Sequence, residues 1–210
     1  IGGPSFLRAA AKNYNQITTL CDPSDYDWVG QKDILSVEDR KSLASKVFSH
    51  VSAYDSMVAK ALDKNPLEQT STQQNFQSFG GELVQVLRYG ENPQQKANWF
   101  RSYGEKGLQD AEILQGKPLS YNNLLDLDAS VRALLSFKEP ACVAVKHNNP
   151  CGIGLADNLE LAVSKSLSAD PVSVFGGIVA LNGIVNDAIA EKLGQIFLEC
   201  VIAIDYTPGA

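Results

Sequence analysis

Residues 141–152 read ACVAVKHNNPCG and set the expectation for the second half of the chain. Every residue of Ala141–Val145 is apolar, which is typical of a strand covered on both faces of a sheet. The run then reaches Lys146 and His147, and we expect the Asn-Asn-Pro-Cys-Gly sequence that follows to stop the strand. Open α/β sheets usually bind ligands at the carboxyl ends of their strands. The stretch therefore predicts a buried strand that carries a cation and a titratable ring to a ligand site.

The pattern around this strand predicts the α/β class. From about residue 120 onward, short apolar runs alternate with segments whose apolar residues recur at helical spacing. Such alternation favours crossover units and a largely parallel central sheet. Strands are expected at 17–21, 82–90, 96–103, 141–145, 176–182 and 200–205, and helices at 5–14, 36–65, 122–138, 158–169 and 186–197.

A change of composition suggests where the chain divides. Residues 65–80 are rich in Gln, Ser and Thr and poor in apolar residues, as linkers are. We therefore expect one domain at 1–65, a linker at 66–80 and a second domain at 81–210. The chain begins IGGPS rather than with Met, and we expect it to be a fragment of a longer protein.

Composition and charge exclude several classes of protein. The 210 residues are 44% hydrophobic and 20% charged, which is ordinary for a soluble globular protein. A net charge of -6 argues against a nucleic-acid surface, which needs clustered Lys and Arg. The four cysteines are dispersed and form no CxxC pair, as expected for reduced thiols in the cytoplasm. No run of residues resembles a signal peptide or is apolar enough to cross a membrane.

The Lys146–His147 pair has three interpretations. A neutral imidazole could act as a general base beside an ammonium that stabilises developing negative charge. The neighbouring cation would also lower the pKa of the histidine and favour the unprotonated base. Alternatively, the pair is only a strand end whose polar groups face water. A third interpretation is a zinc site formed by His147, Cys151 and Cys142, although no paired CxxC supports it.

Other motifs are weaker when taken singly. In LRYGENPQQ (87–95), Arg88 could bind a phosphate monoester and Tyr89 could stack on a planar base, or the arginine could form a surface ion pair. In GKPLSYNN (116–123), Asn122 and Asn123 offer amide groups, although Asn123 could instead cap the next helix. The glycines of ADPVSVFGG (169–177) allow a ligand to approach the backbone closely. Lys12 could hold an anion or could simply end a helix in water.

The motifs together are more specific. The ordered series IGGPSFLRAAAKN, LRYGENPQQ, LSYNN, KHNNPCG, ADPVSVFGG and VIAIDYTP resembles the bifunctional purine-biosynthesis family that combines AICAR transformylase with IMP cyclohydrolase. The resemblance covers essentially the whole chain. It implies that residues 1–65 are the carboxyl end of a methylglyoxal-synthase-like cyclohydrolase domain. It also implies that the remainder is the first part of a transformylase with a cytidine-deaminase-like α/β/α fold.

The resemblance also implies a reaction and its partners. The family transfers a formyl group from the co-substrate 10-formyltetrahydrofolate to AICAR and then closes the ring to IMP, as a cytoplasmic homodimer with no metal. The alternatives are a zinc-dependent deaminase-like enzyme and a non-enzymatic nucleotide-binding fragment. The resemblance implies the catalytic residues Lys146, His147 and Lys12, and the substrate-binding residues Arg88, Tyr89, Gly90, Asn122, Asn123, Phe175, Gly176 and Glu199. The chain departs from the family pattern at Gln94, where histidine is common, and at Ile204, where proline is usual.

Overall fold

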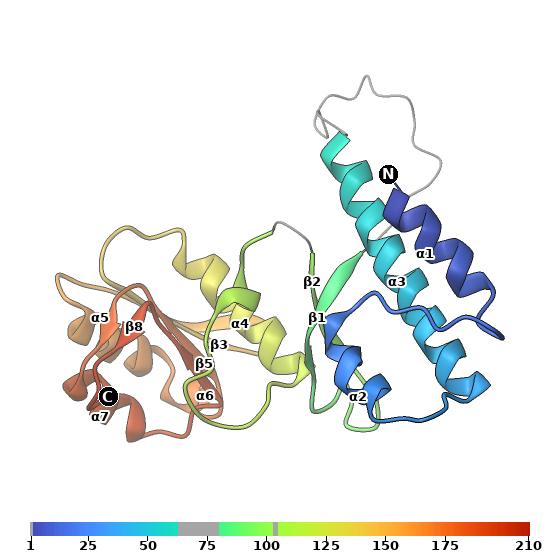
Figure 1. The fold of residues 1–210 in the computed structure, drawn as a ribbon. Helices are drawn as coiled ribbons and strands as arrows, with labels where there is room; N and C mark the ends of the chain where they lie inside the picture. The colour runs from blue at the N-terminus through green and yellow to red at the C-terminus, as the bar shows by residue number, and fades with distance from the viewer. Residues whose placement is uncertain (1, 63–79, 103–104) are drawn as a thin grey trace. The chain divides into compact units, whose positions relative to one another are not determined.

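The computed structural model describes residues 2–62, 80–102 and 105–210 (Figure 1). The chain divides into two compact units, of which the first comprises Ile1–Leu83 with Phe100–Glu105 and the second comprises Val84–Trp99 with Lys106–Ala210. Most of the linker expected at 66–80 lies outside the described residues. Both units combine helices with strands, so the chain is of mixed α/β structure.

The first unit is built on one long helix, as the apolar spacing predicted. Helix α3 (Val37–Leu62) packs against α1 (Gly2–Lys12), and a short turn η1 (Pro23–Asp25) and helix α2 (Tyr26–Gly30) lie between them in sequence. Reciprocal bonds fix the start of α3, because the Asp39 amide donates to Ser36 Oγ and the Ser36 amide donates to Asp39 Oδ2, each at 3.0 Å. The small core of this unit comprises Ala11, Ala44, Val47 and Val51.

The strand expected at 17–21 is absent. Residues 17–21 form no regular structure, although Thr19 is buried. A strand needs a neighbour for its backbone hydrogen bonds, and the described part of the chain supplies none to this segment. The Thr19 hydroxyl also has no hydrogen-bond partner among the described residues. Only Thr19 of this segment is buried, and Ile17 is exposed, so the apolar run did not indicate a core strand.

Two of the other expected strands pair with each other. Strand β1 (Gly81–Val86) and strand β2 (Asn98–Ser102) form a two-stranded sheet. Strand β1 is shorter than expected. Since β1 ends at Val86, Arg88 and Tyr89 lie in the connection beyond it.

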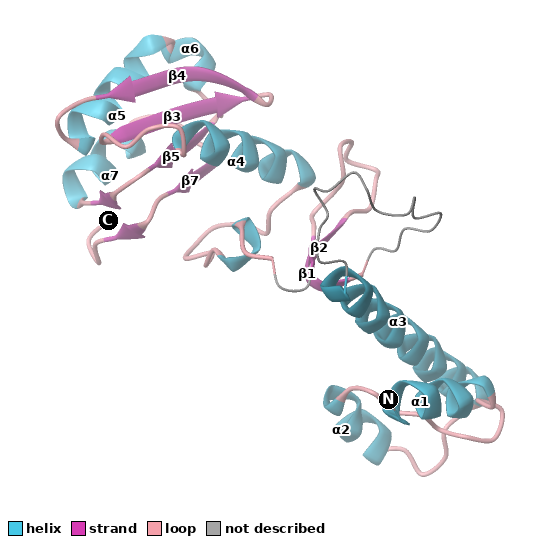
Figure 2. Cartoon of the chain, turned by 90° about the horizontal axis from the view of Figure 1, so that it is seen from above, coloured by secondary structure: helices cyan, strands magenta, loops and turns pink. Residues whose placement is uncertain are grey.

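The second unit contains the main sheet of the chain (Figure 2). In sequence, the helices of this unit come before or between the strands of this sheet. A short pair, β6 (Ile184–Val185) with β8 (Asp205–Tyr206), and a turn η2 (Leu108–Asp110) complete it. The strands of the main sheet are β3 (Ala141–Lys146), β4 (Asn149–Leu155), β5 (Ile178–Leu181) and β7 (Cys200–Ile202), and their order across the sheet is β4-β3-β5-β7. The helices are α4 (Tyr121–Leu134), α5 (Leu159–Ala169), α6 (Pro171–Val174) and α7 (Asp187–Gly194).

The prediction of a largely parallel sheet is wrong. Strand β3 is antiparallel to both of its neighbours, and only β5 and β7 run parallel. The residues expected to stop the strand do end β3 at Lys146, but they then form β4. Pro150 is tolerated in β4 because β4 lies at the edge of the sheet, where a missing backbone donor costs little. The parallel pairing was inferred from the alternation of strands with helices, but β3 and β4 are joined directly by a hairpin, and β3 is antiparallel to β5 as well. The apolar run itself correctly indicated a strand covered on both faces.

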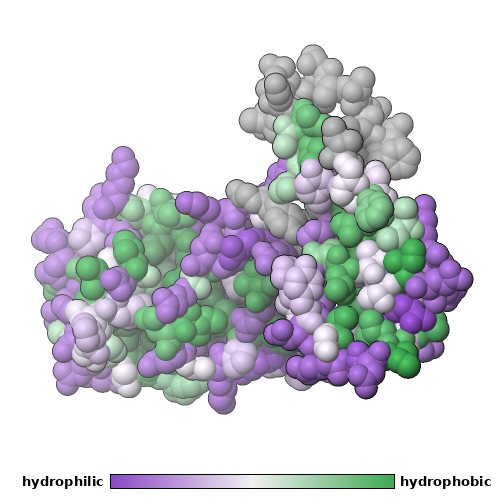
Figure 3. All heavy atoms as spheres, viewed as in Figure 1, coloured by the Kyte–Doolittle hydropathy of each residue, from purple (hydrophilic) through white to green (hydrophobic). Residues whose placement is uncertain are grey.

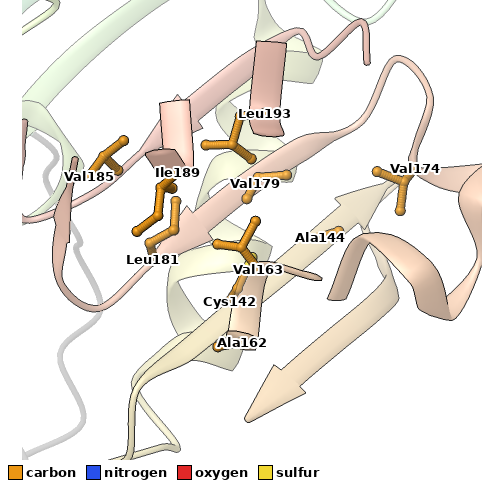
Figure 4. Close-up of a cluster of buried hydrophobic side chains, with 10 residues drawn as sticks. All are labelled: Cys142, Ala144, Ala162, Val163, Val174, Val179, Leu181, Val185, Ile189 and Leu193. Atoms are coloured by element: carbon orange, nitrogen blue, oxygen red, sulfur yellow. The ribbon is translucent and has the colours of Figure 1, made fainter. Parts of the chain in front are cut away.

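Side chains of β3 alternate between two hydrophobic cores. Cys142 and Ala144 face a cluster that includes Val163 of α5 and Leu193 of α7 (Figure 4). Val143 and its neighbours at odd positions face α4 in a second cluster. The sheet therefore lies between α4 on one side and α5 with α7 on the other.

Hydrophobic and hydrophilic residues mingle on the visible face of the molecule (Figure 3). Large apolar side chains that are well exposed include Val86 and Phe100 of the β1–β2 pair and Val172 and Phe175 of the second unit. None of the described helices is both long and apolar enough to span a membrane.

Close packing of β4 on α5 yields a stability prediction. A Cβ atom added at Gly154 would lie 1.9 Å from the Ala162 carbonyl oxygen, so Gly154→Ala forces strand and helix apart. We expect the variant to lose about 1–3 kcal/mol of unfolding free energy, the usual cost of overpacking, in urea denaturation. The matched control is Gly194→Ala, because a Cβ at Gly194 meets nothing within 4 Å. Equal stability of the two variants would contradict this packing.

Candidate active site

A two-residue turn presents the Lys146–His147 pair. Lys146 pairs with Asn149 across the β3–β4 hairpin, so His147 and Asn148 form its loop. Both have left-handed backbone angles, with φ of 52° and 62°. A tight hairpin turn of type I′ requires positive φ at both central residues. Such angles cost residues other than glycine about 1–2 kcal/mol each, so the surroundings must hold this turn in place.

The Lys146 side chain is held by the connection between α6 and β5. Its Nζ donates to the Phe175 carbonyl oxygen at 2.6 Å. Gly176 follows with φ of 73°, and its amide donates to the Phe197 carbonyl oxygen at 2.8 Å. The rings of Phe175 and Phe197 make a tilted contact at 5.7 Å between centroids. The glycine of this motif is therefore needed for a left-handed turn beside the lysine.

The start of α4 supplies the amide groups of the site. Ser120 is the N-cap, and its Oγ accepts from the Asn123 amide at 3.2 Å. The Asn123 side chain reaches back, so that its Oδ1 accepts from the Ser120 amide at 3.0 Å. The same oxygen accepts from Arg88 Nη2 at 3.0 Å. Asn123 thus caps the helix and anchors the arginine at once, whereas the sequence presented capping and binding as alternatives.

The segment that follows β1 runs alongside this helix start. The Arg88 amide donates to the Leu119 carbonyl, and the Tyr121 amide donates to the Tyr89 carbonyl, at 3.1 and 3.2 Å. The Gly90 amide donates to the Gln95 carbonyl at 2.9 Å, and a Cβ at Gly90 would lie 2.9 Å from Gln95 Cβ. These bonds fix the Arg88–Tyr89 pair beside the amide groups of α4.

These elements line an open hollow of about 430 Å³ within the second unit. Its lining includes several residues that the sequence singled out, namely Tyr89, Asn122, Asn123, Lys146, His147, Gly176 and Glu199. It also includes residues that sequence reasoning missed, namely Glu91, Ser120, Leu125, Asp126, Asn148 and Ile178. Spacing could have found Asp126, because it lies four residues after Asn122 and so on the same face of α4.

Four of the expected residues lie outside the lining. Arg88 is next to it through its bond to Asn123, and Gly90 and Phe175 adjoin residues that line it. Lys12 belongs to the first unit, where it is the exposed last residue of α1. The structure therefore brings Lys146 and His147 together with the amide groups, but Lys12 belongs to a different part of the chain.

The cysteines near the hollow are poor nucleophiles at neutral pH. Burial raises the pKa of Cys200 to about 11, and Glu199 adds to this effect while Arg88 opposes it. Burial also raises the pKa of Cys151. A thiolate is the reactive form, so raised values favour the unreactive thiol. The amine and imidazole of the Lys146–His147 pair are therefore the better candidates for chemistry.

The residues proposed for zinc do not gather. Cys142 is fully buried in the cluster facing α5 and α7, whereas His147 is exposed in the turn. Within the described ranges, no three His, Cys, Asp or Glu side chains lie together as a metal site requires. The geometry of this part of the chain thus gives the zinc interpretation no support.

Comparison with known proteins identifies the family. The family model described as "AICARFT/IMPCHase bienzyme" matches residues 10–210. The bifunctional purine biosynthesis protein PurH of Thermoanaerobacter sp. is 48% identical over 216 residues, and that of Lactococcus lactis subsp. cremoris is 44% identical over 218 residues. Each match covers 100% of this chain and 42% of the relative, so the chain spans about two fifths of their length. The chain belongs to the AICARFT/IMPCHase bienzyme family.

Proposed function

We propose that the second unit carries catalytic and substrate-binding groups for formyl transfer from 10-formyltetrahydrofolate to the 5-amino group of AICAR. The reaction is a step of de novo purine biosynthesis, and the complete protein would close the product ring to IMP. The observation that carries the proposal is the position of Lys146 and His147 on one hollow with the amide groups of α4. Membership of the family supports the same reaction.

The chemistry gives each member of the pair a task. The amino nitrogen attacks the formyl carbon, and a C–N bond forms while the carbonyl electrons move to oxygen. His147 accepts the proton of the amine, and the Lys146 ammonium stabilises the oxyanion. The bond between the formyl carbon and N10 then breaks, and N10 takes up a proton. This assistance matters because an amine conjugated to an imidazole carboxamide is a weak nucleophile.

Arg88 is proposed to bind the phosphate of AICAR. Its bond to Asn123 uses one of the five N–H donors of the guanidinium and fixes its position. The remaining donors suit the geometry of a phosphate monoester. The Arg88 guanidinium lies 5.5 Å from the centroid of the Tyr89 ring, so phosphate and base contacts would come from adjacent residues.

We extend the proposal to the finer assignments that the family resemblance implies. The first unit would be part of a methylglyoxal-synthase-like cyclohydrolase domain, with Lys12 in its active site. The second would be part of a cytidine-deaminase-like transformylase. Gly90, Phe175, Gly176 and Glu199 would contact substrate. The complete protein would be a cytoplasmic homodimer that binds AICAR and folate.

Replacing the proposed base tests the reaction. In a full-length protein that carries this segment, we expect His147→Ala to lower kcat by roughly two to four orders of magnitude, the usual contribution of a general base. The affinity for AICAR, measured by calorimetry, should change by less than about threefold because the imidazole acts mainly in the transition state. His50→Ala is the matched control, since His50 is the chain's other histidine and is exposed on α3. Turnover within threefold of the parent protein would remove His147 from the mechanism.

Phosphate recognition is tested by comparing two ligands. We expect Arg88→Ala to weaken binding of AICAR monophosphate by about 10- to 100-fold, as loss of charge-assisted hydrogen bonds does. Binding of the unphosphorylated riboside should change little. Arg132→Ala serves as control, because Arg132 pairs with Asp128 on the exposed side of α4. Equal losses for the two ligands would show that Arg88 has a structural role only.

A further inference from the structure

One contact in the site is explained by neither the family motifs nor the proposed chemistry. The Asn148 backbone amide donates to Asp126 Oδ1 at 2.6 Å, across 22 positions of sequence. We propose that Asp126 is a positioning residue that holds the β3–β4 turn and thereby sets the place of His147. The expected effect on the reaction rate rests on the proposed function, whereas the contact between Asp126 and Asn148 is independent of it.

The turn needs such support. His147 and Asn148 both have positive φ, and neither is glycine. Asparagine tolerates this conformation better than most residues, and glycine tolerates it best. A strained turn persists only where its surroundings fix it. The carboxylate of Asp126 accepts a hydrogen bond from the amide of Asn148, the second turn residue. Asn149 Nδ2 donates to the His147 carbonyl oxygen at 2.9 Å.

Asp126 can hold the turn in a fixed place because the helix that carries it, α4, is itself firmly packed. Helix α4 buries Leu127 and Leu134, and it packs on β3 and β5. Asp126 is partly buried and lines the hollow. The turn is therefore fixed relative to α4 rather than only to its own hairpin.

The contact also connects the two walls of the hollow. Asn122 and Asn123 lie on the first turn of α4, and Asp126 lies one turn later. Through Asn123, the helix fixes Arg88, and through Asp126 it fixes the turn that carries His147. We infer that α4 sets the separation between the phosphate-binding arginine and the base. Misplacement of a reacting group by an ångström can cost about a hundredfold in rate.

Kinetics provide the first test. In the full-length protein, Asp126→Ala should lower kcat by about 10- to 100-fold, in line with misplacement of the base, and leave the KM for AICAR within about threefold. Asp126→Asn should recover most of the rate, because its amide oxygen can still accept from Asn148. Asp128→Ala is the matched control, since Asp128 is on the same helix and pairs with Arg132 instead. An unchanged kcat in Asp126→Ala, or an equal loss in Asp128→Ala, would overturn the inference.

A second-site variant separates positioning from a general loss of structure. Asn148→Gly should relax the turn, because glycine adopts positive φ without strain. The loss of kcat caused by Asp126→Ala should therefore be several-fold smaller in the Asn148→Gly background than in the parent. A loss of the same size in both backgrounds would mean that Asp126 does not act through the turn.

Hydrogen exchange tests the contact without reference to any reaction. In the 210-residue chain, the Asn148 amide should exchange at least tenfold faster in Asp126→Ala than in the parent or in Asp128→Ala, because it loses its acceptor. If Asp126→Ala does not fold, Asp126→Asn should still give several-fold faster exchange, since a neutral acceptor binds more weakly. Unchanged exchange overturns the inference. If exchange is faster in Asp126→Ala but His147→Ala keeps full activity, the contact between Asp126 and Asn148 is supported and the proposed function is refuted.

Discussion

Burial of β3 on both faces is the constraint on which the second unit depends. Ala141–Val145 are each fully buried, with alternate side chains in two separate cores. A strand in this position cannot shift its register by one residue without exchanging the contents of both cores. The end of β3 is therefore fixed along the strand direction. That fixed end is where the chain leaves the apolar interior and reaches its lysine and histidine.

The sequence predicted much of this architecture for identifiable reasons. Helical spacing located α3, α4, α5 and α7, because each buries a continuous apolar stripe. Continuous apolar runs located β3 and β5, because both strands are buried on both faces of the sheet. Pairing direction was not predictable from those runs, because cover by helices produces the same pattern in parallel and antiparallel sheets. Strand β4 was missed because its Pro and two Gly residues are those of a loop, and only its position at the sheet edge and its close approach to α5 make them suitable for a strand.

The candidate site was partly predictable in the same way. Lys146 and His147 stood out because charged groups are unusual after a buried strand. Asp126 did not stand out, because an acidic residue on a helix usually faces water and its role depends on a contact distant in sequence. Asn123 shows a further limit. Its Oδ1 atom both caps α4 locally and anchors Arg88, which is distant in sequence. Sequence patterns predict only the local cap.

The antiparallel hairpin also bears on the order in which the chain folds. β3 and β4 are joined by two residues, so their pairing closes a very short loop, whereas α7 lies in the connection between β5 and its parallel neighbour β7. A ten-residue loop closes within about 10–100 ns and a hairpin forms within about 1–10 μs, and pairings of longer range are slower. The hairpin is thus a natural early element of folding. The residues proposed for chemistry lie at the tip of this hairpin, and its contact with α4 through Asp126 converts a local turn into a fixed one.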